Sequence, residues 1–291
     1  MRVVCIPAFN SEKTIGDVIK KSLKYADKVI VCNDGSTDNT AKIATEHGAH
    51  VIHHEKNQGY GAAIISLFES ARKENADIMV TLDSDGQHNP DEIPRLVNRL
   101  LEKNLDVVIG SRFLNGDSST PSYRKTGIKM ITSASNMGTF FKVRDSQSGF
   151  RAYSKKAIET INPTERGMAI STEILQKISN NGMKVEEVSI TVLYGKDTST
   201  QNAFKHGAAV FINTLKYISV KRPLTFYGVP GIILVIVGSY LGYTFLDAYL
   251  HKQGTFLGSL TAAIILFLAG TILCVTAVIL FSMATMIRDR K

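Results

Sequence analysis

Two long stretches without a charged residue near the C-terminus constrain this chain more than any other feature. No Asp, Glu, Lys or Arg lies between Pro223 and Leu246, and none lies between Gln253 and Ile287. About 20 apolar residues in a helix span the hydrocarbon core of a bilayer, and each stretch is longer. We therefore expect two transmembrane helices, Phe226–Leu246 and Leu257–Met283. The alternative is a pair of buried core helices, but 35 consecutive uncharged residues are hard to bury in a domain of this size.

The charged residues are concentrated before these stretches. The 291-residue chain has 34 basic and 26 acidic side chains, a net charge of +8, and residues 1–222 hold 30 of the basic and 24 of the acidic ones. About a quarter of that segment is charged, as in soluble domains. This distribution excludes a wholly soluble protein and a disordered chain. The three cysteines have no metal-ligand spacing, so we expect small buried side chains rather than a disulfide scaffold.

Basic residues flank both outer ends of the expected hairpin: Lys216, Lys221 and Arg222 before it, and Arg288, Arg290 and Lys291 after it. The connecting turn has no net charge, since it holds one Asp and one Lys. Lys and Arg favour the cytosolic side of a membrane, and the N-terminus resembles a strand rather than a signal peptide. We expect an integral protein of the plasma membrane or an equivalent membrane, with its globular part and C-terminus in the cytosol.

Before residue 111, short β-branched runs alternate with helical patterns. The expected strands are Val3–Pro7, Lys28–Cys32, His50–His53, Ile78–Leu82 and Val107–Gly110. The expected helices between them are Glu12–Tyr25, Thr37–His47, Gly59–Lys73 and Asp91–Lys103. This alternation predicts an α/β fold, a mostly parallel Rossmann-like sheet covered by helices on both faces. Ligands of such sheets bind beyond the carboxyl ends of the strands.

Polar and turn-forming residues follow all five expected strands. The five segments are residues 7–12 (PAFNSE), 33–38 (NDGSTD), 57–61 (NQGYG), 83–88 (DSDGQH) and 110–113 (GSRF). Each alone is ordinary turn or capping chemistry, but the five together indicate a binding site. No Gly-x-Gly-x-x-Gly follows the first strand and no P-loop motif is present, so a dinucleotide or P-loop site is not supported. We expect no nucleic-acid partner.

Asp83 and Asp85 are the most specific feature of these segments. Two carboxylates one residue apart at a strand end, followed by Gln87, can present three oxygens to one point. Hard divalent cations prefer oxygen ligands and keep positions for phosphate oxygens. An EF-hand is excluded because the twelfth loop position counted from Asp83 is Pro94, where that site requires Glu.

In this order, and together with residues 145–151 (DSQSGFR), the motifs resemble family-2 glycosyltransferases. More narrowly, they are similar to the polyprenol-phosphate sugar synthases of the dolichyl-phosphate mannose synthase type. The resemblance covers about residues 1–195 and implies a glycosyltransferase A fold. We expect a catalytic domain over 1–200, an amphipathic juxtamembrane helix over 201–222, and two transmembrane helices with a short basic tail over 223–291.

The resemblance also implies roles for individual residues. Asp83, Asp85 and Gln87 would bind Mg²⁺ or Mn²⁺, and Asp145 would supply a carboxylate near the reacting centre. Glu173 is a second candidate for that carboxylate, although it can equally be a charge at a helix N-terminus. The nucleotide-sugar donor would contact six residues: Pro7, Phe9, Glu12, Asn33, Asp34 and Arg112. Ser11 and Asn33 depart from the family's usual acidic residues, which leaves the donor base open.

The acceptor side is expected in the middle of the chain. Residues 122–141 and 204–218 both have the pattern of basic amphipathic helices, which suits docking on anionic lipid. The resemblance implies that Arg124 and Ser133 hold a lipid phosphate. The loop after Tyr194 lacks the Arg and the Gly-Gly-Ser-Lys run common in relatives. Lys196, Lys205 and His206 remain alternatives for that diphosphate contact.

These features predict metal-dependent transfer of a sugar, with inversion, from a nucleotide-diphosphate-sugar to a polyprenyl (dolichyl) phosphate at the cytosolic face. The second pKa of a phosphate monoester is about 6, so this acceptor is already anionic and needs positioning more than deprotonation. The expected partners are the donor, the acceptor and the bilayer, and the sequence leaves a homo-oligomer open. The alternatives are a transferase acting on another lipid or glycan, and a membrane-anchored nucleotide-sugar binding protein without catalysis.

Overall fold

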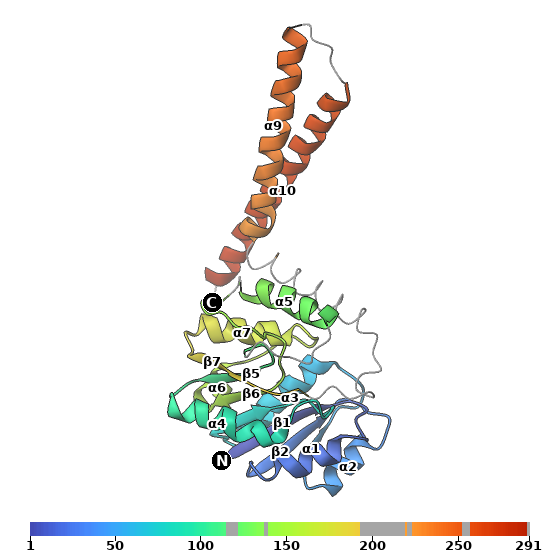
Figure 1. The fold of residues 1–291 in the computed structure, drawn as a ribbon, viewed down its shortest axis with the longest axis vertical. Helices are drawn as coiled ribbons and strands as arrows, with labels where there is room; N and C mark the ends of the chain where they lie inside the picture. Colours follow the sequence, from blue (N-terminus) through green and yellow to red (C-terminus); the bar gives the residue numbers. More distant parts are fainter. Residues whose placement is uncertain (115–121, 137–138, 193–218, 220–222, 252–256, 290–291) are drawn as a thin grey trace. The chain divides into compact units, whose positions relative to one another are not determined.

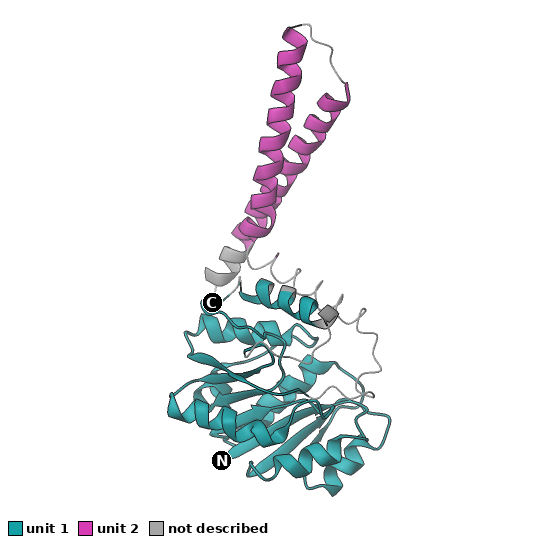
Figure 2. Cartoon of the chain, in the orientation of Figure 1, with its two compact units in different colours: residues 1–214 teal, residues 215–291 magenta. Residues whose placement is uncertain are grey.

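The computed structural model describes residues 1–114, 122–136, 139–192, 219, 223–251 and 257–289. The chain forms two compact units, Met1–Thr214 and Leu215–Lys291 (Figure 2). The predicted juxtamembrane helix over 201–222 and the predicted boundary after residue 200 fall on positions that lie, apart from Ser219, outside the described residues.

The first unit is built on a β-sheet with helices packed against it (Figure 1). The sheet has seven strands in the order β3-β2-β1-β4-β6-β5-β7. β1, β2, β3 and β4 pair in parallel, as do β5 and β7, whereas β6 is antiparallel to both of its neighbours. The predicted mostly parallel sheet is thus confirmed. The strands are β1 (Arg2–Ala8), β2 (Lys28–Asn33), β3 (His50–His53), β4 (Ile78–Thr81), β5 (Val107–Ser111), β6 (Arg151–Ser154) and β7 (Val185–Ser189).

Helices cover both faces of this sheet, and each face has its own buried apolar cluster. Alternate residues of β1 point into different clusters: Val4 and Ile6 into one, Val3 and Cys5 into the other. α1 (Ile15–Ser22), α2 (Thr40–Glu46) and α4 (Ile93–Glu102), which follows the short η1 (Pro90–Glu92), pack on the first face. α3 (Tyr60–Lys73), α6 (Lys155–Thr160) and α7 (Ile170–Asn180) pack on the second.

All five strands expected from the sequence are present, and each end lies within one residue of its expected position. The expected helix over 122–141 is shorter: α5 spans Ser122–Asn136. The side chain of Asn136 donates to the carbonyl oxygen of Val143 (2.8 Å) and accepts from its N–H (3.0 Å). These two bonds tie the last residue of the helix to Val143, and residues 139–143 do not continue the helix.

The second unit contains the π-helical turn η2 (Leu224–Gly228) and the long helices α9 (Val229–Leu250) and α10 (Leu257–Asp289). Two candidate membrane spans, Leu224–Leu250 and Leu257–Met283, are long and apolar enough to cross a bilayer. Only 17% and 11% of their most apolar windows are buried, unlike the core helices of a soluble domain. The second expected span is reproduced, and the first is longer than expected at both ends.

Candidate functional site

The loops after β1, β2 and β4 meet at the carboxyl edge of the sheet, where β1 lies between β2 and β4. Asn10 joins the first two loops: its N–H donates to Ser36 Oγ (3.0 Å), and its side-chain oxygen accepts from Thr37 N–H (2.9 Å). Ser11 Oγ lies 2.8 Å from Ser84 Oγ, which joins the first loop to the Asp-Ser-Asp segment. The structure therefore brings together the segments that the sequence predicts to form one site.

Most of the predicted donor-binding residues are engaged within the protein. Asp34 is 3% exposed; its carboxylate accepts from the N–H groups of Gln58 and Gly59 (2.9 Å each) and lies 2.6 Å from His54 Nδ1. Asn33 is also buried, and its side-chain oxygen accepts from Ser36 N–H at 3.3 Å. These two residues thus shape the loops, and their contact with a donor stays a prediction.

The first strand and its loop supply the other predicted donor contacts. Pro7 is buried within β1, opposite Cys32 of β2. Glu12 accepts a hydrogen bond from Asn39 N–H at 3.1 Å. Phe9 follows the strand and is 40% exposed. Its ring is therefore the part of this group that is open to a stacking partner.

Asp83 and Asp85 follow β4, and both side chains are partly buried. The Tyr60 hydroxyl donates to Asp83 Oδ1 at 3.1 Å, and Gln87 N–H donates to Asp85 Oδ1 at 2.9 Å. Burial raises the pKa of Asp83, against the Tyr60 bond and nearby positive charge. Burial, and then the charge of Asp83, raise the pKa of Asp85. Two partly desolvated carboxylates that repel each other favour a bound cation between them.

The residues fit a divalent metal that takes some of its ligands from the protein and the others from a substrate. Among the described residues, no three His, Cys, Asp or Glu side chains are arranged to hold a metal by themselves. Mg²⁺ is commonly held by one or two carboxylates, with phosphate oxygens and water completing its coordination. The donor set of Asp83, Asp85 and Gln87 matches that requirement. His88 adjoins it, but burial lowers its pKa to about 4, so its imidazole is neutral at pH 7.

Gly149 brings the backbone of the 145–151 segment against the Asp83 carboxylate. A Cβ at Gly149 would lie 2.6 Å and 2.7 Å from the two carboxylate oxygens of Asp83 and 2.9 Å from the Tyr60 hydroxyl. The Thr81 hydroxyl donates to the Gly149 carbonyl oxygen at 2.7 Å, which holds the segment in place. Only a residue without a side chain allows this approach.

Arg112 and Asp145 form a bidentate ion pair beside these carboxylates. Arg112 Nε and Nη2 donate to Asp145 Oδ2 and Oδ1 at 2.6 Å and 2.7 Å, and Arg112 N–H donates to Oδ2 at 3.1 Å. The Asp145 side chain has no exposed surface, whereas that of Arg112 is 14% exposed. The positive charge of Arg112 lowers the pKa of Asp83 against the larger effect of burial. Arg112 is thus a fixed cation near the candidate metal ligands.

The structure places Glu173 in a different setting. It lies in the first turn of α7, where its carboxylate accepts from the N–H groups of Thr164 and Glu165 and from the Thr164 hydroxyl. It also pairs with Lys177 at 3.1 Å. Burial raises the pKa of Glu173, but these hydrogen bonds outweigh it, and the net shift is downward. The described contacts join Glu173 to the 164–165 loop rather than to Asp83, Asp85 or Asp145.

The predicted acceptor residues are only partly described. Ser133 is exposed on α5. Arg124 belongs to the same helix, but its side chain is outside the described part of the structure, as are Lys196, Lys205 and His206. Two neighbours of Ser133 face inward: the Thr132 hydroxyl lies 3.0 Å from Ser146 Oγ, and the Ser135 hydroxyl lies 3.2 Å from Thr172 Oγ1. These contacts attach α5 to the 145–151 segment and to α7.

The sequence pattern gave no role to Tyr60, Gly149 or Glu187. Tyr60 and Gly149 lie within segments that the pattern singled out, but their contacts with Asp83 join parts of the chain far apart in sequence. Glu187 lies in β7, which was not expected as a strand. Its two carboxylate oxygens accept from the N–H groups of Arg144 (2.8 Å) and Asp145 (3.0 Å).

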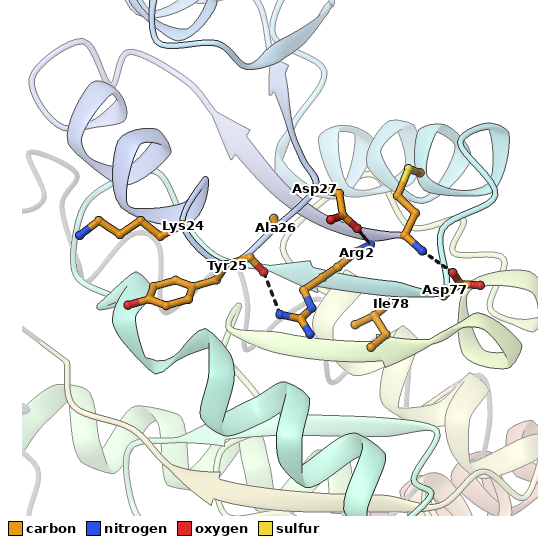
Figure 3. Close-up of a pocket in the computed structure, with 8 residues that line it drawn as sticks. Arg2, Lys24, Tyr25, Ala26, Asp27, Asp77 and Ile78 are labelled. Atoms are coloured by element: carbon orange, nitrogen blue, oxygen red, sulfur yellow. Dashed lines mark hydrogen bonds and ion pairs between the residues drawn. The ribbon is translucent and has the colours of Figure 1, made fainter.

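A separate cavity of about 460 Å³ lies at the opposite edge of the sheet, where β1 and β4 begin (Figure 3). Arg2 Nη1 donates to the Tyr25 carbonyl oxygen at 3.0 Å, and Arg2 N–H donates to Asp27 at 2.6 Å. The terminal amine of Met1 pairs with Asp77. Both signs of charge line this cavity, and its residues are partnered mainly with one another.

Comparison with known proteins identifies the family. Residues 3–161, more than half of the chain, match the model of glycosyl transferase family 2. An uncharacterised protein of Methanocaldococcus jannaschii is 35% identical over 199 residues, 66% of this chain and 81% of that protein. A UDP-N-acetylglucosamine–dolichyl-phosphate N-acetylglucosaminyltransferase of Methanococcus voltae is 32% identical over 229 residues, 71% of this chain and 89% of that protein.

Solved structures agree on the fold. Glucosyl-3-phosphoglycerate synthase of Mycobacterium tuberculosis, in complex with Mn²⁺, UDP and phosphoglyceric acid, superposes with a TM-score of 0.59 at 24% identity. The match covers 74% of this chain and 77% of that one. The predicted glycosyltransferase A fold is therefore confirmed, followed by two apolar helices that form a candidate transmembrane hairpin. The chain is a glycosyltransferase and belongs to glycosyl transferase family 2.

Proposed function

We propose that this protein transfers a sugar, with inversion and with the help of a divalent metal, from a nucleotide-diphosphate-sugar to a polyprenyl phosphate. The observation that carries this proposal is the grouping of two partly buried carboxylates, Asp83 and Asp85, with the fixed cation Arg112 at the carboxyl edge of the sheet. This is the chemistry that a sugar diphosphate requires: ligands for a metal on its phosphates, and a second positive charge beside them.

The residues around the diphosphate would have different roles. Asp83, Asp85 and Gln87 would hold Mg²⁺ or Mn²⁺, which when bound neutralises part of the charge on the leaving diphosphate. Arg112 adds a guanidinium whose plane is set by Asp145 before the donor arrives. Phe9, with its exposed ring, and the loops shaped by Asn33 and Asp34 line the side expected for the nucleoside.

The reaction needs no separate base on the protein. A lipid monophosphate oxygen is anionic at neutral pH, since its second pKa is about 6. Its attack forms a new bond to the sugar C1 while the bond from C1 to the diphosphate oxygen breaks. The electron pair leaves with the nucleoside diphosphate, and the configuration at C1 inverts. The protein's contribution is orientation of the two substrates and stabilisation of the departing charge.

The acceptor class is supported by relatives and by the hairpin. The Methanococcus voltae relative is named for transfer to dolichyl phosphate, and a relative from Mycolicibacterium smegmatis, 28% identical over 65% of this chain and 76% of its own length, is named a polyprenol monophosphomannose synthase. Two candidate spans would keep the transferase beside a lipid acceptor. Arg124 and Ser133 are the positions proposed for its phosphate, with the catalytic unit on the cytosolic side.

Membranes that contain the protein provide the direct test. They would be incubated with a panel of radiolabelled nucleotide-sugars, and the lipids would then be extracted. We expect label from one donor in a mild-acid-labile lipid, and none after EDTA treatment. Label in a glycan or in a different lipid class would reassign the acceptor. Nucleotide-sugar binding without transfer to any acceptor would favour a binding protein.

Replacing one metal ligand tests the site itself. Asp85→Asn removes a carboxylate oxygen that the proposed metal requires, so sugar transfer should fall by at least about a hundredfold. Thermal unfolding and size-exclusion profiles should remain those of the wild type. Asp91→Asn is the matched control, since Asp91 lies on η1 and accepts a hydrogen bond from Tyr25 instead. Full activity of the Asp85 variant would remove the metal assignment.

A further inference from the structure

Three charged side chains form a continuous series from β7 to the candidate site. Glu187 accepts hydrogen bonds from two successive backbone N–H groups, those of Arg144 and Asp145, at 2.8 Å and 3.0 Å. Asp145 in turn holds Arg112 through both of its carboxylate oxygens, at 2.6 Å and 2.7 Å. The series ends at the Arg112 guanidinium, whose charge acts on Asp83.

The middle member of this series has no exposed surface. The Asp145 side chain is fully buried, and its two oxygens accept three hydrogen bonds from Arg112, one of them from the backbone N–H at 3.1 Å. A carboxylate engaged in this way and closed to solvent does not contact the reacting atoms. Asp145 therefore acts through Arg112, and Glu187 acts through the backbone that carries Asp145.

We propose that Glu187 and Asp145 are positioning residues that hold Arg112 in the orientation needed to bind the diphosphate of the donor. This inference rests on the proposed function, in which Arg112 meets that diphosphate. A guanidinium in bidentate contact with a buried carboxylate has a set plane and few accessible rotamers. Groups oriented in advance stabilise developing negative charge without rearranging during the reaction.

Glu187 suits this task because its two oxygens match two donors. The N–H groups of Arg144 and Asp145 each meet a different carboxylate oxygen. Glutamine has nearly the same size but only one acceptor oxygen, and its NH₂ group would face an N–H donor. Glu187→Gln therefore removes one of the two bonds that set the position of Asp145, with little change in volume.

The adjacent residue provides a matched control. Glu186 lies in the same strand, but successive residues of a strand point to opposite faces, and Glu186 pairs with Arg99 of α4 at 2.6 Å. Glu186→Gln thus makes the same chemical change on the face that does not contact the 145–151 segment. An effect that Glu187→Gln has and Glu186→Gln lacks belongs to the face on which Glu187 contacts residues 144 and 145 and Ser111.

Nucleotide binding by the full-length protein in detergent tests the proposal. Affinities would be measured with Mg²⁺ for UDP and UMP and for GDP and GMP, and the pair that the wild type binds more tightly would be followed. Glu187→Gln should weaken the diphosphate by about tenfold and the monophosphate by less than about twofold, because Arg112 is expected to meet the second phosphate. Glu186→Gln should change neither. Equal losses for both nucleotides would show a general structural effect and overturn the proposal.

A double-mutant cycle tests whether Glu187 acts through Arg112. In an Arg112→Gln background, Glu187→Gln should cause no further loss of diphosphate affinity, because the group it positions is already absent. Additive losses would contradict the series. Should Glu187→Gln not fold, Asp145→Asn, which disturbs the next contact in the series, must show the same diphosphate-selective loss, and its absence would overturn the proposal.

These measurements are independent of the acceptor. If no lipid-linked sugar is formed while the diphosphate-selective loss is observed, the proposed acceptor is wrong and the positioning role stands. If lipid-linked sugar is formed and the loss of affinity is the same for both nucleotides, the proposed acceptor stands and the positioning role is wrong.

Discussion

At the scale of single residues, Gly149 shows how closely the candidate metal ligands are enclosed. A side chain there would lie within 2.7 Å of both carboxylate oxygens of Asp83, closer than carbon and oxygen atoms approach without a bond. Gly149→Ala should therefore displace Asp83 and raise the Mg²⁺ or Mn²⁺ concentration for half-maximal transfer by about 10–100-fold, the range seen when a metal ligand loses its support. A metal titration of sugar transfer measures this change.

Gly127→Ala is the control for that substitution. Gly127 lies within α5, and a Cβ there would meet no atom within 4 Å among the described residues, apart from the backbone of its own helix. Alanine is the better helix former, so this variant should keep its metal dependence and gain about 0.5–1 kcal/mol of stability. An unchanged metal dependence in both variants would mean that Asp83 does not hold the metal.

The sequence predicted the location of individual residues where they follow a strand, while their roles stay predictions. Asp83, Asp85 and Arg112 were found because the carboxyl ends of parallel strands meet at one edge of the sheet. The bond from Tyr60 to Asp83 and the burial of Asp145 could not be read in the same way. Both depend on contacts between segments 23 to 33 residues apart, and no local pattern records such pairings.

At the scale of elements, the loop that precedes α7 packs against the start of α3. The carbonyl oxygen of Arg166 accepts from Ala62 N–H at 3.1 Å, and Glu173 holds the same loop through the N–H groups of Thr164 and Glu165. Because α3 also carries Tyr60, the position of this loop bears on the Asp83 side of the site. Glu173 is thus a structural anchor in the described contacts.

The stability of the Glu173 contact should depend on pH. Hydrogen bonds to its carboxylate lower its pKa below the ordinary value of 4.5, although burial acts in the opposite direction. The stability it contributes is therefore fully present above about pH 4.5 and is lost as the pH falls through the lower folded pKa. Glu173→Gln should cost about 1–3 kcal/mol at pH 7, and its difference from the wild type should shrink at low pH.

Thermal unfolding in detergent between pH 3.5 and 7 measures that difference. Glu159→Gln is a suitable control because Glu159 is exposed on α6, where a surface change alters stability by about 0.5 kcal/mol or less. If the difference between wild type and Glu173→Gln were the same at all pH values, the anchoring role of this carboxylate would be contradicted.

The turn after α5 presents an aromatic side chain to solvent. Phe140 is 89% exposed, while its N–H donates to Ser179 Oγ at 2.7 Å and the Thr139 hydroxyl donates to the Phe141 carbonyl oxygen at 2.6 Å. Lys142 is also exposed. An exposed aromatic ring on an anchored backbone, beside a cation, suits the interface of an anionic bilayer, in line with the docking predicted for residues 122–141.

Tryptophan fluorescence can test this docking, because the chain has no tryptophan of its own. In vesicles containing anionic lipid, Phe140→Trp should emit at shorter wavelength than in vesicles of neutral lipid alone and should be quenched by brominated acyl chains. Leu101→Trp, at a position 60% exposed on α4, should be quenched instead by an aqueous quencher. Aqueous quenching of both reporters to the same extent would exclude docking through this turn.

The sequence predicted the elements where periodicity was clear and failed where it was not. The first five strands are apolar runs bounded by turn residues. β6 and β7 were not expected. β6 begins with Arg151 and ends with Ser154, which leaves only two residues between polar ends, and β7 carries two adjacent glutamates. Both are strands because their neighbours β4 and β5 offer backbone partners, which is tertiary information.

At the scale of the whole molecule, the second unit is a closely packed helical pair. A Cβ at Gly270 of α10 would lie 2.6 Å from the carbonyl oxygen of Gly231 in α9, and one at Gly238 would lie 2.7 Å from the backbone nitrogen of Phe267. Glycines at such contacts let two helical backbones approach, as in membrane proteins. If both helices span the bilayer, this pairing would return the chain to the side from which it entered.

This pairing predicts that the transferase unit and the C-terminus lie on the same side of the membrane. The basic residues before the first span and after the second should keep both ends in the cytosol. Protease added to sealed inside-out vesicles should digest the N-terminal unit and remove an epitope placed after Lys291, whereas right-side-out vesicles should protect both. An epitope inserted between Gln253 and Thr255, in the segment between the two candidate spans, should behave in the opposite way. Opposite accessibility of the two ends would mean that only one helix spans the bilayer. The transferase unit would then have to reach the acceptor headgroup without a two-helix anchor.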